Sequence, residues 1–154
     1  MKKVLISIHP RWCKKIISGE KVLELRKSKP KLDLPFRCYI YCTKGTGKNT
    51  LNIPVTNKRF FEDYQKGSMA CLNSPIGNGK VIGEFTCNFI LNHCEMENAD
   101  IAQMQSCVKT EEIKDYAGEK EVFGWRISDL TIYDDPKDLQ DFNISRPPQS
   151  WSYL

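Results

Sequence analysis

The stretch SGEKVLELRKSKP, residues 18–30, carries charged side chains on a segment whose apolar residues alternate as in a β-strand. In such a strand Leu23 and Leu25 point to one face, while Glu24 and Arg26 point to the other. The polar face is consistent with two interpretations, a solvated strand surface or one wall of a polar cleft. The function that the sequence supports depends on which of them holds.

The residues before this stretch predict a strand and a short helix. KVLISI, residues 3–8, is β-branched and apolar, which is typical of a buried strand. In HPRWCKKIISG, residues 9–19, Pro10 suits the first helical position and the final glycine can adopt the left-handed conformation that ends a helix. Lys21 and Glu24 then share a site only if Lys21 still lies in the turn after this helix.

The rest of the chain predicts further short strands with a few helices between them. Five to seven short strands favour the α+β class and a small mixed β-barrel with peripheral helices over a parallel sheet. No repeat or linker divides the sequence, so residues 1–154 are expected to form one domain. Strands are expected at 36–43, at 80–95 (one strand, or two with a bulge at Gly83), at 121–135 (one or two) and in the C-terminal tail, and helices at 58–65, 99–106, 110–118 and 136–142.

The composition favours a cellular compartment in which cysteine thiols stay reduced. The formal net charge of +4 is compatible with a nucleic-acid partner but does not require one. No apolar stretch is long enough to span a bilayer, and the N-terminus does not match a secretion signal. Seven cysteines in such a chain predict free thiols and a cytoplasmic location.

The cysteines and the glycine-rich loop do not match known metal or phosphate motifs. Cys38 and Cys42 share one face of a predicted strand and Cys87 lies on another strand, but the tight C-x-x-C hook of zinc sites is absent. Buried structural cysteines are therefore expected. TKGTGKNT, residues 43–50, fails the phosphate-loop pattern because Asn49 follows the lysine. We expect neither a metal nor a cofactor.

Glu84 lies within VIGEF, an otherwise apolar strand. An unpaired buried carboxylate is very costly, so this side chain must face water or have a cationic partner. A lysine or arginine from residues 21–27 is the natural partner, and an ordinary solvent-facing glutamate is the alternative.

Three further positions are candidates for ligand contact. Arg126 lies beside Trp125, and Arg146 lies near Trp151. Such basic and aromatic pairs can hold phosphates and stack bases, although core tryptophans with surface arginines produce the same pattern. His9 lies where a strand gives way to a helix, where it either packs locally or borders a cleft.

Together these segments resemble the ASCH domain, a branch of the PUA-like superfamily. The signature G-x-K-x-x-E-x-R matches in full from Gly19 to Arg26, and it is followed by VIGEF and WRISDL in the same order. The ending SRPPQSWSY is similar to that of small stand-alone ASCH proteins of bacteria and their phages. Residues 44–79 lie outside the likeness, and we expect them to be an insertion between barrel strands.

The resemblance implies a pseudo-barrel of about six strands and a cleft beside the first helix, lined by Lys21, Glu24, Arg26 and Glu84. The superfamily is largely associated with RNA or modified nucleotides. Some ASCH members are nucleases, or amidohydrolases acting on acetylated cytidine. In the amidohydrolases the lysine matches Lys21 and the late glutamate matches Glu84. Their reactive threonine falls at Glu24, and a carboxylate cannot replace a nucleophilic threonine.

The leading hypothesis is a binding domain for RNA or a nucleotide. Lys21 and Arg26 would meet phosphate or a base edge, and Glu24 and Glu84 would orient them and accept from an exocyclic amine. The first alternative is a hydrolase, an amidohydrolase or ribonuclease with Lys21 as base or nucleophile, Glu84 as proton shuttle and Glu24 in the same catalytic set. The second is a protein-interaction module that uses residues 44–79. Further ligand-binding candidates are His9, Trp12, Tyr41, Arg126 and Trp151.

Overall fold

The larger of two β-sheets forms the centre of the molecule. The structure, a computed structural model, describes residues 2–47, 52–53, 76–92 and 99–154. The strand order in this sheet is β7-β4-β3-β1-β8. The strands β1 and β3 are parallel, and the other neighbours are antiparallel. The strands are β1 (Lys3–Ile8), β3 (Phe36–Cys42), β4 (Val81–Cys87), β7 (Ser128–Lys137) and β8 (Trp151–Tyr153).

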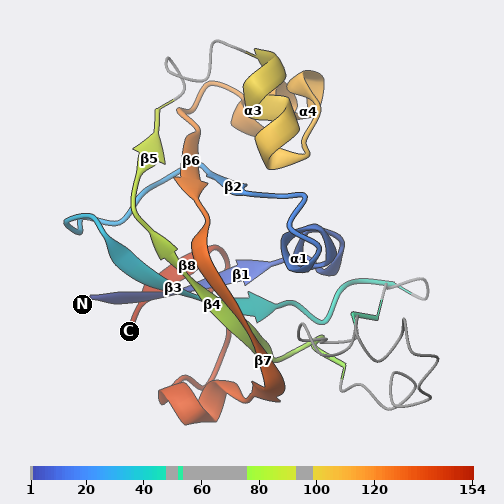
Figure 1. The fold of residues 1–154 in the computed structure, drawn as a ribbon, viewed down its shortest axis with the longest axis vertical. Helices are drawn as coiled ribbons and strands as arrows, with labels where there is room; N and C mark the ends of the chain where they lie inside the picture. The colour runs from blue at the N-terminus through green and yellow to red at the C-terminus, as the bar shows by residue number, and fades with distance from the viewer. Residues whose placement is uncertain (1, 48–51, 54–75, 93–98) are drawn as a thin grey trace.

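A smaller antiparallel sheet lies at one end of the larger one (Figure 1). Its order is β2-β6-β5, and its central strand pairs with both neighbours. Two extended segments connect the sheets, because β4 leads into β5 and β6 leads into β7 (Figure 1). The strands are β2 (Leu23–Arg26), β5 (Ile90–Leu91) and β6 (Phe123–Arg126).

The helices lie around these sheets. Helix α1 flanks the sheets, and α3 and α4 lie together beyond the smaller sheet (Figure 1). Among the described residues, no helix is long and apolar enough to cross a bilayer. The helices are α1 (Pro10–Ile17), α3 (Ala99–Ser106), α4 (Thr110–Ala117) and the 3-10 helix η3 (Leu139–Phe142).

The main core lies between the larger sheet, α1 and β6. Its largest side chain is Trp125, which is fully buried and meets the ring of Phe36 edge-on at 5.6 Å. The cysteines predicted to be structural, Cys38, Cys42 and Cys87, are buried in this cluster. This confirms that they serve as small apolar side chains.

Two smaller apolar clusters lie outside the main core, one at β2 and one on the opposite face of the larger sheet. Leu23 and Leu25 of β2 pack against residues of α3 and α4. The opposite face of the larger sheet carries Leu5 and Tyr39, and η3 covers it through Phe142. The larger sheet is therefore covered on both faces.

The α+β class is confirmed, and the strands form two sheets. Eight strands are described instead of five to seven, because 80–95 and 121–135 each divide into two. The closed barrel stays a prediction. The register of β4 against β7 shifts between Val81 and Gly83, next to the predicted bulge, but the division into two strands comes after Cys87 and not at Gly83. A Cβ atom there would collide with the backbone oxygen of Thr131, so only glycine fits.

Two helical predictions have other outcomes. Of the turn predicted at 136–142, Pro136 lies inside β7, and the helical turn begins only at Leu139 as η3. An edge strand tolerates proline because its outer N–H needs no partner in the sheet. The helix predicted at 58–65 lies outside the described residues.

Candidate functional site

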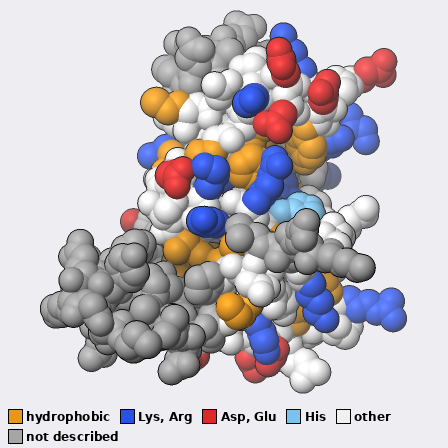
Figure 2. All heavy atoms as spheres, turned by 90° about the vertical axis from the view of Figure 1, so that its right-hand side faces the viewer, with side chains coloured by type: hydrophobic (Ala, Val, Ile, Leu, Met, Phe, Trp, Pro, Cys, Tyr) orange, Lys and Arg blue, Asp and Glu red, His pale blue; other side chains and the backbone are white. Residues whose placement is uncertain are grey.

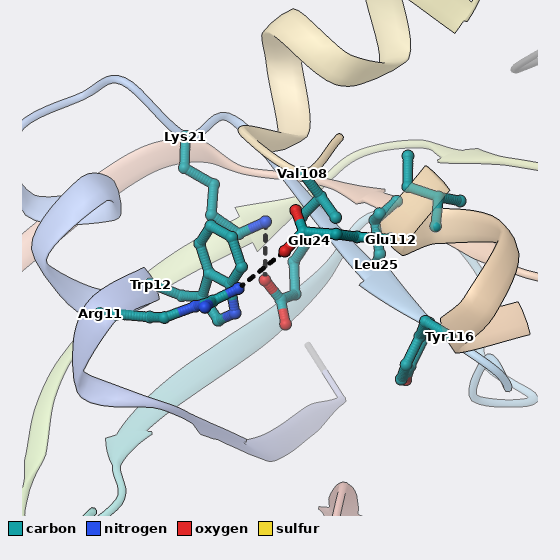
Figure 3. A pocket seen from close by; sticks show the side chains of 9 residues that line it. Arg11, Trp12, Lys21, Glu24, Leu25, Val108, Glu112 and Tyr116 are labelled. Atoms are coloured by element: carbon teal, nitrogen blue, oxygen red, sulfur yellow. Dashed lines mark ion pairs between the residues drawn. The ribbon is translucent and has the colours of Figure 1, made fainter. Parts of the chain in front are cut away.

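A pocket of about 180 Å³ opens between α1, the segment 21–25 and α4 (Figure 3). Trp12 and Tyr116 lie on opposite sides of it, and the carboxylate of Glu24 lies between them (Figure 3). The complete lining is Arg11, Trp12, Lys21, Glu24, Leu25, Val108, Glu112, Ile113 and Tyr116.

The end of α1 brings Lys21 to the same side as Glu24. Gly19 has a φ of 77°, a left-handed conformation that turns the chain out of the helix. The backbone N–H of Lys21 then donates to the carbonyl of Lys15 at 2.9 Å, so Lys21 still belongs to this turn. The strict alternation of the strand begins only at Leu23. This is the condition under which the sequence predicts a shared site.

The ammonium of Lys21 has a full set of partners. It donates to the carbonyl oxygens of Leu23 at 2.9 Å and Ser106 at 2.8 Å, and it lies 3.2 Å from Oε2 of Glu24. An ammonium has three protons to donate, and these are three acceptors. The side chain is 2% exposed, and its Nζ lies 5.1 Å from the ring centre of Trp12. Each of the three ammonium protons therefore has an acceptor within the protein.

Arg26 completes a buried chain of charges. Its Nη2 lies 2.8 Å from Oε1 of Glu24 and donates to the carbonyl of Ser7 at 2.6 Å. Its Nη1 donates to Oγ of Ser150 at 3.3 Å, and its buried Nε has no hydrogen-bond partner among the described residues. Glu24 thus neutralises one cation with each oxygen. The solvated-surface interpretation of this strand is wrong, because Glu24 and Arg26 are 5% and 8% exposed as whole residues.

An exposed ion pair spans the pocket between α1 and α4. Arg11 Nη2 lies 3.7 Å from Oε1 of Glu112, and the two side chains are 61% and 49% exposed. Such exposed pairs contribute only about 0–1 kcal/mol, so a ligand can replace this one at little cost. Arg11 also stacks on Trp12, with Cζ 4.1 Å from the ring centre.

The surface around α1 combines apolar and basic groups. On the face that carries α1, Figure 2 shows hydrophobic side chains bordered by several Lys and Arg side chains. Acidic side chains gather nearer the α3 and α4 end of this face (Figure 2). This mixture suits a ligand that has both a planar apolar part and negative charge.

Glu84 does not line this pocket. It lies opposite Tyr39 in the β3–β4 ladder, on the sheet face that η3 covers. Its carboxylate is 3.1 Å from Arg37 Nη1 and accepts a 2.6 Å hydrogen bond from the hydroxyl of Tyr133. The predicted pairing with a cation from residues 21–27 is therefore wrong, because strand alternation turns Glu84 away from β2. Burial, and then the bond to Glu84, raise the pKa of Tyr133.

The other sequence candidates lie in three places. His9 and Tyr41 line a second groove at the ends of β1 and β3. Trp151 packs against Trp125 and donates from Nε1 to Oγ of Ser28 at 3.0 Å. Arg126 is half-buried at the end of β6, where it stands opposite Leu23 of β2 in the strand pairing. Of the three aromatic candidates, only Trp12 lines the pocket.

Sequence reasoning missed the contribution of α4. Glu112 and Tyr116 stand four residues apart, so they share one face of the helix, with Ile113 beside them. The helix was predicted, but nothing in its sequence indicates that this face lies against α1. The approach of α4 to α1 depends on how the whole chain packs, which the local sequence does not specify.

No family model and no curated protein matches the chain. Among solved structures, the chain is similar to an ASCH protein from Zymomonas mobilis, with 21% identity and a TM-score of 0.65, over 99% of this chain and 87% of that one. Two single-substitution mutants of that protein match with TM-scores of 0.63 and 0.62 at 20% and 18% identity. They cover 99% and 100% of this chain, and 88% and 91% of theirs.

Proposed function

We propose that this chain, which has an ASCH-type fold, binds RNA or a nucleotide in the pocket beside α1. The observation that carries the proposal is the arrangement of Trp12 and Tyr116 on either side of the Glu24 carboxylate (Figure 3). A nucleobase is planar and has hydrogen-bond donors on its edge. Stacking on such a ring contributes about 1–3 kcal/mol per base.

Glu24 is the group best placed to read a base edge. Each of its oxygens meets one cation, at 3.2 Å from Lys21 and 2.8 Å from Arg26. A carboxylate has about four acceptor positions, so it retains capacity for an exocyclic amine or ring N–H. Lys21 and Arg26 then hold the carboxylate in place. This differs from the sequence-based expectation that both cations contact the ligand directly.

Arg11 is the cation of the pocket that is open to a phosphate. It is 61% exposed, and its ion pair with Glu112 is long. Lys27 adds a second cation at the rim, with Nζ 4.7 Å from the ring centre of Tyr116. Charge-assisted hydrogen bonds from such groups are the usual means of holding phosphate.

The hydrolase alternative has less support. A lysine that acts as base or nucleophile must present its nitrogen to the substrate, whereas Nζ of Lys21 is buried and faces three acceptors of the protein. The proposed proton shuttle, Glu84, lies on another face of the larger sheet. The protein-interaction alternative depends on residues 44–79, of which 44–47, 52–53 and 76–79 are described.

The test measures binding and turnover on the same samples. The probes are a fluorescent single-stranded RNA hexamer of mixed sequence and the four nucleoside monophosphates, at low and high salt, with chromatography of the products. Tyr116→Ala is compared with Tyr153→Ala, because these tyrosines are 40% and 52% exposed but only Tyr116 lines the pocket.

We expect Tyr116→Ala to lower affinity about 5- to 150-fold, as the loss of one stacked base predicts, and Tyr153→Ala to change it less than about twofold. Equal affinities for the two variants would remove the pocket from the proposal. If the wild-type protein binds neither the RNA hexamer nor the monophosphates, the proposed function is rejected. Product formation would favour the hydrolase.

A further inference from the structure

A second groove, of about 910 Å³, lies at the ends of β1 and β3. Its other wall is formed by residues 138–149, which include η3. The lining is rich in hydroxyl and amide groups, which suit a sugar better than a base. These groups belong to Ser7, Tyr41, Thr43, Gln140, Ser145 and Gln149.

Thr43 gives this groove an unused polar atom. Its Oγ1 is buried and has no hydrogen-bond partner among the described residues. Buried hydroxyl groups are nearly always paired, so an unpaired one in the wall of a groove points to a partner that comes from outside. Thr43 lines the groove and is only partly buried, so rotation about χ1 turns this oxygen toward the groove, where a ligand hydroxyl can donate to it or accept from it.

The charges at the groove favour an anionic ligand. Lys44 supplies a cation to the lining and His9 a ring nitrogen that can donate a hydrogen bond, and both side chains are exposed. Gly79 leaves room for the Lys44 side chain, because a Cβ atom there would lie only 3.2 Å from Cγ of Lys44. The acid in the lining, Asp138, is already paired with Lys80. The uncompensated charge is therefore positive.

Arg26 connects the groove with the pocket. The same Nη2 atom holds Glu24 of the pocket and the carbonyl of Ser7 in the groove. On the surface, His9 of the groove and Arg11 of the pocket are two residues apart, at most about 7.6 Å between Cα atoms. The two hollows are therefore neighbours on either side of the start of α1.

We infer that the groove binds the ribose and phosphate of the nucleotide next to the one whose base enters the pocket. The ligand is then a single strand of RNA and not a free nucleotide, with Thr43 at a ribose hydroxyl and Lys44 and His9 at a phosphate. The 2′-hydroxyl is the group by which proteins distinguish RNA from DNA. This inference rests on the proposed function of the pocket.

The experiment compares the RNA hexamer with a DNA hexamer and with nucleoside monophosphates. Thr43→Val removes the hydroxyl while keeping the shape, and Thr131→Val on the exposed part of β7 is its control. Lys44→Gln removes one charge, and Lys120→Gln, exposed after α4, is its control. Thermal unfolding of all four variants verifies that they fold.

We expect Thr43→Val to weaken hexamer RNA binding about tenfold and to leave monophosphate binding unchanged. Thermal stability should not fall, since an unpaired buried hydroxyl is lost. Lys44→Gln should reduce the slope of log affinity against log salt by about 0.7 for RNA. The controls should match the wild type.

Two results would overturn the inference while leaving the pocket intact. One is equal affinity for monophosphates and the RNA hexamer, with no effect of either groove variant. The other is equal affinity for the RNA and DNA hexamers, which would remove the ribose contact. If none of the probes binds, the proposed function fails and this inference fails with it.

Discussion

The ammonium of Lys21 lies 3.2 Å from the carboxylate of Glu24, and the two side chains are 2% and 7% exposed. Both come from a stretch of four residues that begins in a turn and ends in a strand. A buried pair of this kind costs much to desolvate and is strongly destabilising to break. Its position at the wall of a pocket is therefore the main link between the fold and the proposed function.

Replacing the carboxylate should destabilise the fold. Glu24→Gln leaves two buried cations, Lys21 and Arg26, without their common anion. We expect the free energy of unfolding to fall by about 3–5 kcal/mol, measured by urea denaturation. The control is Glu20→Gln, which breaks an exposed pair with Lys15 and should leave stability close to that of the wild type. Equal effects of the two variants would contradict the buried triad.

A double-mutant cycle tests whether Lys21 and Glu24 act as one unit. The cycle uses Lys21→Met, Glu24→Gln and the double variant. Once Glu24 has lost its charge, removing Lys21 should cost less, so the double variant should be about 1–3 kcal/mol more stable than the sum of the single losses predicts. Losses that add within about 0.5 kcal/mol would show that the two groups are not coupled. Urea denaturation of the four proteins gives the values.

Glu84→Gln should leave RNA binding unchanged. Glu84 lies on the sheet face covered by η3 and is paired with Arg37 and Tyr133, away from the pocket lining. We expect the affinity for the RNA hexamer to stay within about twofold of the wild type, while loss of the pair with half-exposed Arg37 costs about 1 kcal/mol or less. A large loss of binding or turnover would restore Glu84 to the candidate site and strengthen the hydrolase alternative.

Stability should fall as the pH rises above about 9. Burial raises the pKa of Cys87 from 9.0 to about 12. Between these values the unfolded chain loses the thiol proton while the folded chain retains it, so alkaline conditions favour unfolding. The stabilising contribution is complete below pH 9 and is lost as the pH approaches 12.

Urea denaturation in reductant at about pH 8 and about pH 10.5 measures this loss. Burial also raises the pKa of Cys13 and Cys38, whereas a hydrogen bond from Cys13 lowers that of Cys42. Cys87→Ala should therefore show a smaller decline than the wild type but not abolish it. Cys107→Ala, outside the core, should decline as the wild type does. An unchanged decline in Cys87→Ala would show that this thiol is not responsible.

Much of the local structure could be read from the chain. Pro10 and Gly19 bound α1, and the apolar runs mark β1 and β3, because these signals depend on neighbouring residues alone. Leu23 and Leu25 face away from Glu24 and Arg26, as strand alternation requires. The resemblance added the expectation of a cleft beside α1, where the structure has a pocket.

The sequence by itself therefore determined most of the elements and the α+β class, and it made a shared position of Lys21 and Glu24 depend on a turn at Lys21. Tertiary structure alone decided which faces meet. It placed Tyr116 of α4 across from Trp12, and it turned Glu84 toward Arg37 and Tyr133. The physical reason is that periodicity specifies the face of an element on which a side chain lies, but not which element packs against that face. That choice depends on the packing of the whole core.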